Sequence, residues 1–181
     1  MEPKDFYRYL YRKLNKRTPL STDCGMLCGN ACCVDSGEEP LGMYLFPFEE
    51  EALQGAKNLT IEDSDFQINE RPVKIAFCAP YCNRKDRPLA CRIFPLFPYV
   101  DKTGYMQVIV DPRSRECCPL HKLEQNELSP KFVRGVRHIA KLLMRNESTR
   151  EFLYETSRLI DEELELRWQF LESKIPYLHS L

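Results

Sequence analysis

The spacing of the cysteines constrains this chain more than any other feature. Four of the nine cysteines fall between Cys24 and Cys33, in the pattern Cys-x3-Cys-x3-Cys-Cys. The other five are Cys78, Cys82, Cys91, Cys117 and Cys118. Residues 20–121 therefore form a cysteine-rich region, and we expect the rest of the chain to support it.

The start of the chain decides how these cysteines are interpreted. Residues 1–5 lack the apolar stretch of a signal peptide, so we expect a cytoplasmic protein. A reducing cytosol disfavours disulfides, and nine cysteines would leave one thiol over in a disulfide framework. In that compartment, clustered cysteines indicate metal binding or redox chemistry. We therefore predict a metal-binding region.

The charge balance and the lack of a long apolar run argue against nucleic-acid and membrane partners. The 26 basic and 27 acidic residues nearly cancel, so we expect no nucleic-acid partner. The sequence has no run of about 18 apolar residues, so we expect no membrane span. The length of 181 residues suits one domain, and we predict a single domain over residues 1–181.

The first cysteine motif allows two geometries. In a helix, Cys24, Cys28 and Cys32 would lie on one face with about 6 Å between neighbours. Sulfurs bound to one zinc ion lie within about 4 Å of each other, so the first and third could not share an ion. Gly25 and Gly29 permit positive φ angles. They favour a loop, or at most a short helical turn.

Apolar periodicity predicts the elements between the cysteine groups. Residues 4–16 repeat apolar side chains at helical spacing, and residues 47–56 suit a short helix whose early glutamates, Glu49 to Glu51, complement the helix dipole. Alternation predicts a strand near 43–46 and two or three short strands within 58–77. Residues 97–110 predict a hairpin that turns at 101–104.

Two helices are predicted in the last third of the chain, over residues 129–175. Ser129-Pro130 is a helix start, and Ser148-x-x-Glu151 is a capping box for the second helix. Their short connection predicts an antiparallel pair that covers the metal region. The predicted fold class is therefore α+β: an irregular cysteine-rich metal-binding region with short strands, packed against an α-helical hairpin.

The cysteine motifs resemble those of the YkgJ-like cysteine-cluster family of zinc- or iron-chelating proteins. The resemblance covers about residues 20–120. It rests on the cluster at 24–33, on Arg87-Pro88-x-x-Cys91-Arg92-x-Phe94-Pro95, and on Cys118-Pro119-Leu120. The first motif of the family has two-residue gaps, where this chain has three. The resemblance implies eight metal ligands: Cys24, Cys28, Cys32, Cys33, Cys78, Cys82, Cys91 and Cys118.

The ligand set leaves the metal open between an iron–sulfur cluster and zinc. Eight thiolates suit two tetrahedral zinc ions, or one four-iron cluster with further thiols elsewhere. The adjacent cysteines at 32–33 and 117–118 favour a cluster, and Cys-x2-Cys knuckles are absent. Cys117 is predicted to be the extra thiol. His121 is either a ligand or a surface histidine.

The expected role is that of a binding or electron-transfer protein. The alternatives are a metal-dependent enzyme, of a redox or methyl-transfer accessory type, and a structural zinc module for protein interaction. The sequence contains neither a glycine-rich phosphate loop nor a G-x-S-x-G motif, so neither of these motifs supports an enzyme. Arg92 is the predicted cofactor-binding residue because a cation offsets thiolate charge. Phe94 is predicted to anchor its loop in the core.

Overall fold

The computed structural model describes residues 1–32, 42–78 and 84–178, with side chains described up to residue 172. Helices and antiparallel strands are both present, so the predicted α+β class is confirmed. Two predicted ligands, Cys33 and Cys82, lie outside the described residues. Within the described ranges, no helix is both long and apolar enough to cross a membrane.

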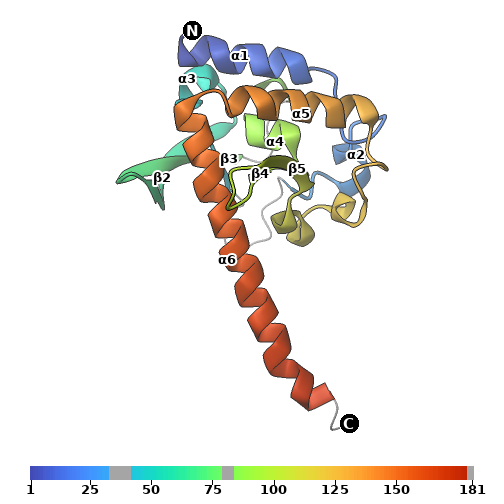
Figure 1. Ribbon diagram of the computed structural model, residues 1–181. Coiled ribbons are helices and arrows are strands. Elements are labelled where there is room, and N and C mark those ends of the chain that lie inside the picture. The colour runs from blue at the N-terminus through green and yellow to red at the C-terminus, as the bar shows by residue number, and fades with distance from the viewer. Residues whose placement is uncertain (33–41, 79–83, 179–181) are drawn as a thin grey trace.

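Long helices form both ends of the described chain, and short turns lie between them (Figure 1). The long helices are α1 (Pro3–Leu14), α5 (Pro130–Leu143) and α6 (Glu147–Leu178). The short α-helices are α2 (Gly25–Cys28), α3 (Glu50–Leu53) and α4 (Leu89–Ile93). The 3-10 turns are η1 (Arg84–Asp86), η2 (Pro112–Glu116) and η3 (Pro119–Lys122).

The strands form two small antiparallel sheets, as the alternating sequence predicts. In the first sheet, β3 (Arg71–Cys78) lies between β1 (Gly42–Tyr44) and β2 (Leu59–Ile68). The second sheet is the predicted hairpin of β4 (Leu96–Val100) and β5 (Met106–Val110). The register of β2 against β3 shifts between Asp63 and Gln67, which is the signature of a bulge.

The main core joins the N-terminal helix to the C-terminal helices. Apolar residues at helical spacing bury one face of α1 and one face of α5, because each stripe needs a partner surface. These two helices pack side by side, with α4 beneath α1 and the second sheet beneath α5 (Figure 1). The fully buried members of this core include Tyr7, Leu10, Leu89, Leu96, Phe132, Val136, Ile139, Leu143, Leu153 and Ile160.

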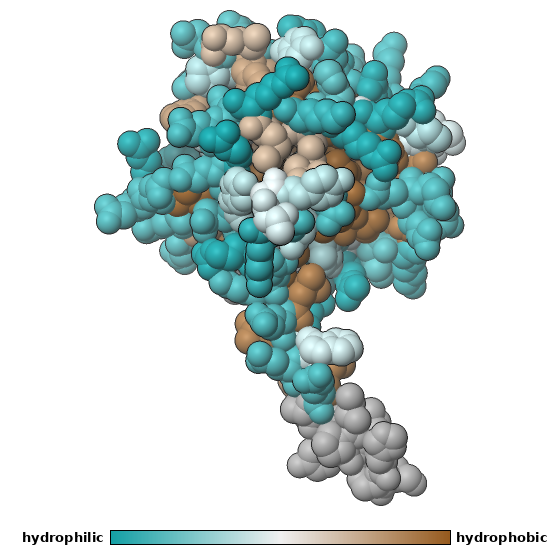
Figure 2. Space-filling view, viewed as in Figure 1, coloured by the Kyte–Doolittle hydropathy of each residue, from teal (hydrophilic) through white to brown (hydrophobic). Residues whose placement is uncertain are grey.

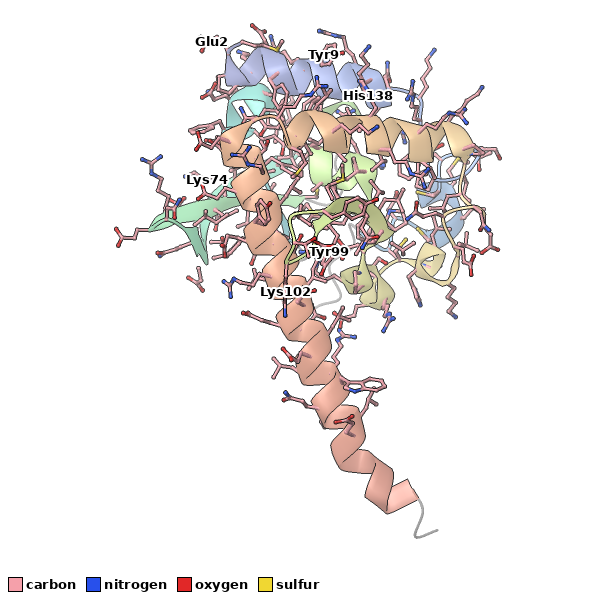
Figure 3. All side chains as sticks on the ribbon, in the orientation of Figure 1. Glu2, Tyr9, Lys74, Tyr99, Lys102 and His138 are labelled. Carbon is pink, nitrogen blue, oxygen red and sulfur yellow. The ribbon has the colours of Figure 1, made fainter. Side chains whose placement is uncertain are left out.

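The first half of α6 is attached to β4. Ser157 Oγ accepts a hydrogen bond of 2.9 Å from the Val100 backbone N–H, and the Tyr99 hydroxyl donates one of 2.7 Å to Asp161 Oδ1. Tyr99 lies beside α6 in Figure 3. These bonds link the second sheet to the helix at the last positions where its apolar residues are buried.

The second half of α6 leaves the body, so the predicted antiparallel hairpin is wrong. Figure 1 shows the chain turning sharply at residues 144–146, after which α6 runs away from α5. Apolar side chains beyond residue 163 are exposed, and hydrophobic residues are visible on the protruding helix in Figure 2. They are Leu164, Leu166, Trp168, Phe170 and Leu171.

The start and end of α6 also differ from the predicted ones. The helix begins at Glu147, and Asn146 Oδ1 accepts a hydrogen bond of 3.1 Å from the Thr149 backbone N–H. Asn146 is therefore the capping residue, and the predicted capping box at Ser148 is wrong. The helix continues to Leu178, three residues beyond the predicted end at residue 175.

Candidate metal centre

Six cysteines line one cavity of about 100 Å³, which we call the thiol cavity. It lies at the end of the molecule that holds α2, opposite the β2–β3 hairpin (Figure 1). Its thiols come from all three cysteine groups of the sequence: Cys24, Cys28, Cys32, Cys91, Cys117 and Cys118. Within the described part of the chain, the fold thus brings together five of the predicted ligands and Cys117.

The first group is held by a single helical turn, as its two glycines predict. Cys24 begins the turn, and its carbonyl accepts hydrogen bonds from the backbone N–H groups of Leu27 and Cys28. Gly29, at φ 61°, ends α2 in the left-handed conformation that glycine adopts without strain. Gly25 is buried, and a Cβ there would lie 2.2 Å from Asn30 Oδ1. Gly29 is therefore required by its backbone conformation, whereas a side chain at Gly25 would displace the Asn30 side chain.

Cys91 reaches the cavity because α4 buries its opposite side. Leu89 and Ile93 are one helical turn apart and both are buried in the main core. Cys91, halfway between them, faces away from that core. Phe94 was predicted to anchor this segment in the core, but it is only half-buried and lines the thiol cavity. Ile93 is the anchor instead.

The third group lies between two consecutive 3-10 turns. Cys117 follows η2 and Cys118 precedes η3, and the backbone N–H of Cys118 donates 2.8 Å to the Ser114 carbonyl. Asp111 holds the start of η2 by accepting 3.0 Å from the Arg113 backbone N–H. Both cysteines line the cavity, so the structure does not set Cys117 apart as an extra thiol.

Two residues considered at the sequence level lie elsewhere. Cys78 is half-buried at the end of β3, paired in register with Leu59, and it does not line the thiol cavity. His121 Nδ1 lies 2.7 Å from the Cys118 carbonyl oxygen and does not line the cavity either. Of the two alternatives for His121, ligand or surface histidine, this placement favours the surface histidine.

Burial and neighbouring thiols raise the pKa of two thiols of this cavity, Cys24 and Cys118. Burial raises the pKa of Cys24, and Asp23, Cys28 and Cys118 raise it further, whereas Arg87 lowers it. Burial also raises the pKa of Cys118, and Cys28 adds to that increase. Each of these thiols is thus within electrostatic reach of another. Metal binding here would release protons, because the ligand form of cysteine is the thiolate.

The residues of the cavity offer the right donor atoms for a metal, but the described side chains are not arranged closely enough to coordinate one. Thiolate sulfur is the donor that zinc and iron–sulfur clusters prefer. However, within residues 1–32, 42–78 and 84–178, no three His, Cys, Asp or Glu side chains are close enough to hold one ion. The described cysteines therefore share a cavity but do not form a closed ligand set.

Four arginines line the same cavity: Arg17, Arg84, Arg87 and Arg92. Arg84 is held by Asp23 Oδ2 at 3.5 Å and by the Arg17 carbonyl at 3.2 Å. Cations at this position suit a centre that carries several negatively charged sulfurs. Arg92, the predicted cofactor-binding residue, is one of the four.

Arg92 is fixed in place by its backbone partners and by an aromatic ring. Its Nε donates 2.7 Å to the Arg87 carbonyl and its Nη2 donates 2.6 Å to the Lys85 carbonyl. The guanidinium carbon lies 4.2 Å from the centre of the Tyr11 ring, which is a cation–π contact. Arg92 thus joins the residues before α4 to α1.

Glu49 supports this wall from behind, a role that the sequence did not reveal. It is fully buried and accepts hydrogen bonds from the Tyr11 hydroxyl at 2.6 Å, the Phe46 N–H at 3.1 Å and the Leu89 N–H at 2.5 Å. The bond from Leu89 caps the first turn of α4. Burial raises the pKa of Glu49 to about 7. Only an acidic cluster at a predicted helix start marked it in the sequence.

Neither α5 nor α6 lines the thiol cavity, so the prediction that this helical pair covers the metal region is wrong. The end of α1, the loop after it, α2, α4 and the η2–η3 segment line it instead. Comparison with protein-family models, with curated proteins and with solved structures gave no match.

Proposed function

We propose that this protein binds an iron–sulfur cluster or zinc through cysteine thiolates at the thiol cavity. The observation that carries the proposal is the convergence of six cysteines, from three groups far apart in the sequence, on one cavity with four arginines. Thiols that only fill space in a core would not be expected to cluster at one cavity beside four arginines. We also propose that the protein is YkgJ-like and cytoplasmic. A reducing compartment such as the cytoplasm keeps thiols available for metal.

The number of donors favours a cluster over a single zinc ion. A structural zinc ion takes four ligands, and six thiols line the cavity. A cluster or a pair of ions accommodates adjacent residues such as Cys117 and Cys118 more readily than one small ion does. When bound, a cluster would supply one-electron redox chemistry, which makes electron transfer the proposed role.

Metal binding at this site is proposed to draw the thiols together. The cysteines are brought to one cavity by helical packing, but they must approach within about 4 Å of each other to share an ion. Binding free energies of structural metals are of order 10 kcal/mol or more, enough to order short segments without regular structure. The arginines then offset the negative charge that the thiolates acquire.

Anaerobic purification followed by metal analysis and visible spectroscopy tests the proposal. We expect at least one equivalent of zinc, or at least two of iron with matching acid-labile sulfide and broad visible absorption. Iron without sulfide would point to mononuclear binding. Protein that is folded, carries no metal and fails to bind added zinc or reconstituted cluster would refute metal binding.

A further inference from the structure

Positive charge is concentrated in two stretches of the chain, each of which contains a long helix. Residues 1–17 and 130–145 hold 11 of the 26 basic residues and 2 of the 27 acidic residues. Their net charge is therefore +9, against −10 for the rest of the chain. Including the flanking Glu124, Glu127 and Glu147 reduces the positive charge only to +6. The near balance of the whole sequence thus conceals a strong segregation of charge.

Tertiary packing joins the two stretches in one surface. The helices α1 and α5 are neighbours at the end of the molecule opposite the protruding part of α6 (Figure 1). They approach closely at Gly135, where a Cβ would lie 3.3 Å from Leu14 Cδ2. Tyr9 of α1 and His138 of α5 mark this end in Figure 3. We call this surface the basic face, and its exposed cations are Arg8, Arg12, Lys13, Lys16, Lys131, Arg134, Arg137, Lys141 and Arg145.

The cations of the basic face repel one another along each helix. Arg8 and Arg12 are four residues apart on α1, as are Arg137 and Lys141 on α5, and like charges at this spacing destabilise a helix. In the part of the chain that the structure describes, the ion pairs involve other cations: Lys74, Arg84, Arg113, Arg158 and Arg167. An anionic partner at the basic face would replace this repulsion by attraction.

The composition of the basic face discriminates between kinds of polyanion. No large hydrophobic side chain of α1 or α5 is exposed. A helix that lies on a membrane inserts exposed apolar residues, and the centre of a protein–protein interface is apolar. Interfaces with nucleic acid are instead polar and strongly positive. Five of the nine exposed cations are arginines, whose planar guanidinium groups match phosphate. Nucleic acid is therefore the partner that fits this face.

The basic face favours a duplex over a single strand. Proteins that bind single strands stack the bases on aromatic side chains. Tyr9 is half-buried, and Lys13 Nζ lies 4.9 Å from the centre of its ring, so this ring is not an open stacking platform. The 14 residues of α5 extend over about 21 Å, a length along which a duplex presents about six phosphates on each strand.

We propose that the basic face binds a nucleic-acid duplex through its phosphate backbone. The cations of α1 and α5 contact successive phosphates, and α6 protrudes in the opposite direction and leaves the face accessible (Figure 1). The balanced total charge, from which no nucleic-acid partner was expected, does not describe this face. The proposal does not depend on metal binding, so either can fail without the other.

Fluorescence anisotropy of a labelled DNA duplex of about 20 base pairs, titrated with the full chain as purified, tests the proposal. Cations that bind phosphates release counterions, so the affinity should fall steeply with salt. We expect binding at about 50 mM NaCl that weakens about 100-fold at about 200 mM, as four phosphate contacts predict. No binding to the duplex at the lower salt concentration, or an affinity that salt does not change, would overturn the proposal.

Competition at equal concentration of negative charge identifies the kind of polyanion. The competitors are a single DNA strand, polyglutamate and vesicles that contain phosphatidylglycerol. Because a duplex has the highest charge density along its axis, unlabelled duplex should displace the probe at least about threefold more effectively than each of them. A competitor that displaces the probe as well as the duplex does would assign the face to that polyanion and overturn the choice of a duplex.

Charge-neutralising variants locate the contact on the molecule. Arg12→Gln on α1 and Lys141→Gln on α5 should each weaken duplex binding at least about threefold and lower the slope of log affinity against log salt by about 1. Lys102→Gln makes the same change at an exposed lysine on the turn of the β4–β5 hairpin, away from the basic face (Figure 3), and should change neither quantity. All three side chains are exposed, so we expect the variants to fold. Unchanged binding by the double variant of Arg12 and Lys141, or an equal loss from Lys102→Gln, would contradict the assignment.

Discussion

The hydroxyl of the half-buried Tyr11 donates a hydrogen bond of 2.6 Å to Glu49, which is fully buried behind the wall of the thiol cavity. The same tyrosine ring carries the guanidinium of Arg92 on its face. The pair thus joins α1 and the start of α3 to the segment that holds Cys91. Supporting contacts of this kind hold ligand-bearing segments in place.

Replacing Glu49 by alanine should destabilise the protein strongly. The change removes the acceptor of three hydrogen bonds, from Tyr11, Phe46 and Leu89, and leaves those donors buried. Each unsatisfied donor costs about 1–3 kcal/mol, so we expect a loss of more than about 2 kcal/mol. Urea denaturation at neutral pH measures it. Glu51→Ala, on the same short helix, should shift the free energy of unfolding by less than about 0.5 kcal/mol.

Glu49 should also make stability depend on pH. Its folded-state pKa of about 7 exceeds the ordinary value of 4.5, so between these values the folded state binds more protons than the unfolded state. The free energy of unfolding should therefore fall as pH rises from 4.5 to 7, by about 3 kcal/mol for this group alone. The difference between wild type and Glu49→Gln isolates it. Equal pH profiles of the two proteins would contradict the raised pKa.

Cysteines of the thiol cavity should matter more for metal than Cys78 does. Cys24→Ser and Cys91→Ser each remove one donor from the cavity, and we expect both to lower the bound metal at least twofold and to lower the melting temperature. Cys78→Ser is the matched control, because Cys78 does not line the cavity. Metal analysis and thermal unfolding measure both effects. Equal metal loss in all three variants would show that the site extends to β3.

Only the first half of α6 should contribute to stability. Deleting residues 164–181 removes side chains that, over the described residues 164–172, are exposed apart from the half-buried Arg167. It also removes the ion pairs of Arg167 with Glu116 and Glu163, a type worth about 0–1 kcal/mol. The unfolding midpoint should change little. Removing residues 126–181 instead exposes the core against which α5 packs, and we expect insoluble protein. A stable, soluble 1–125 fragment would show that the helices are not needed for folding.

Asn146, and not Ser148, should account for the start of α6. Asn146→Ala removes the acceptor for the Thr149 N–H and should cost about 1 kcal/mol. Ser148→Ala should cost less than about half of that, because Ser148 lies inside the helix. Urea denaturation of the two variants tests the assignment. A larger loss from Ser148→Ala would restore the capping box.

Local patterns were sufficient for several of the secondary-structure elements. The hairpin of β4 and β5, the β2–β3 pair and the helix start at Ser129 agree with predictions from alternation, turn residues and capping signals. These features depend on neighbours along the chain, which the sequence displays directly. The glycines Gly25 and Gly29 favoured a loop or at most a short helical turn, and the single turn Gly25–Cys28 is the second of these.

Packing decided what local patterns leave open. The apolar residues of α6 from Leu164 onward look like a buried stripe, yet the direction of α6 from the bend at 144–146 carries them away from the body. Phe94 and Ile93 are equally apolar, and only the orientation of α4 in the core places one at the cavity and buries the other.

The sequence by itself determined the element types and the presence of a thiol-rich region, because periodicity and residue chemistry are local properties. Only the tertiary structure decided which thiols meet, that Cys78 does not line the thiol cavity, and that Glu49 supports the wall. Those outcomes depend on contacts between residues distant in the chain. The hydrophobic burial that favours such contacts has no preferred direction. Many packing arrangements of the same helices and strands would bury similar apolar surface, so the sequence pattern alone does not select one of them.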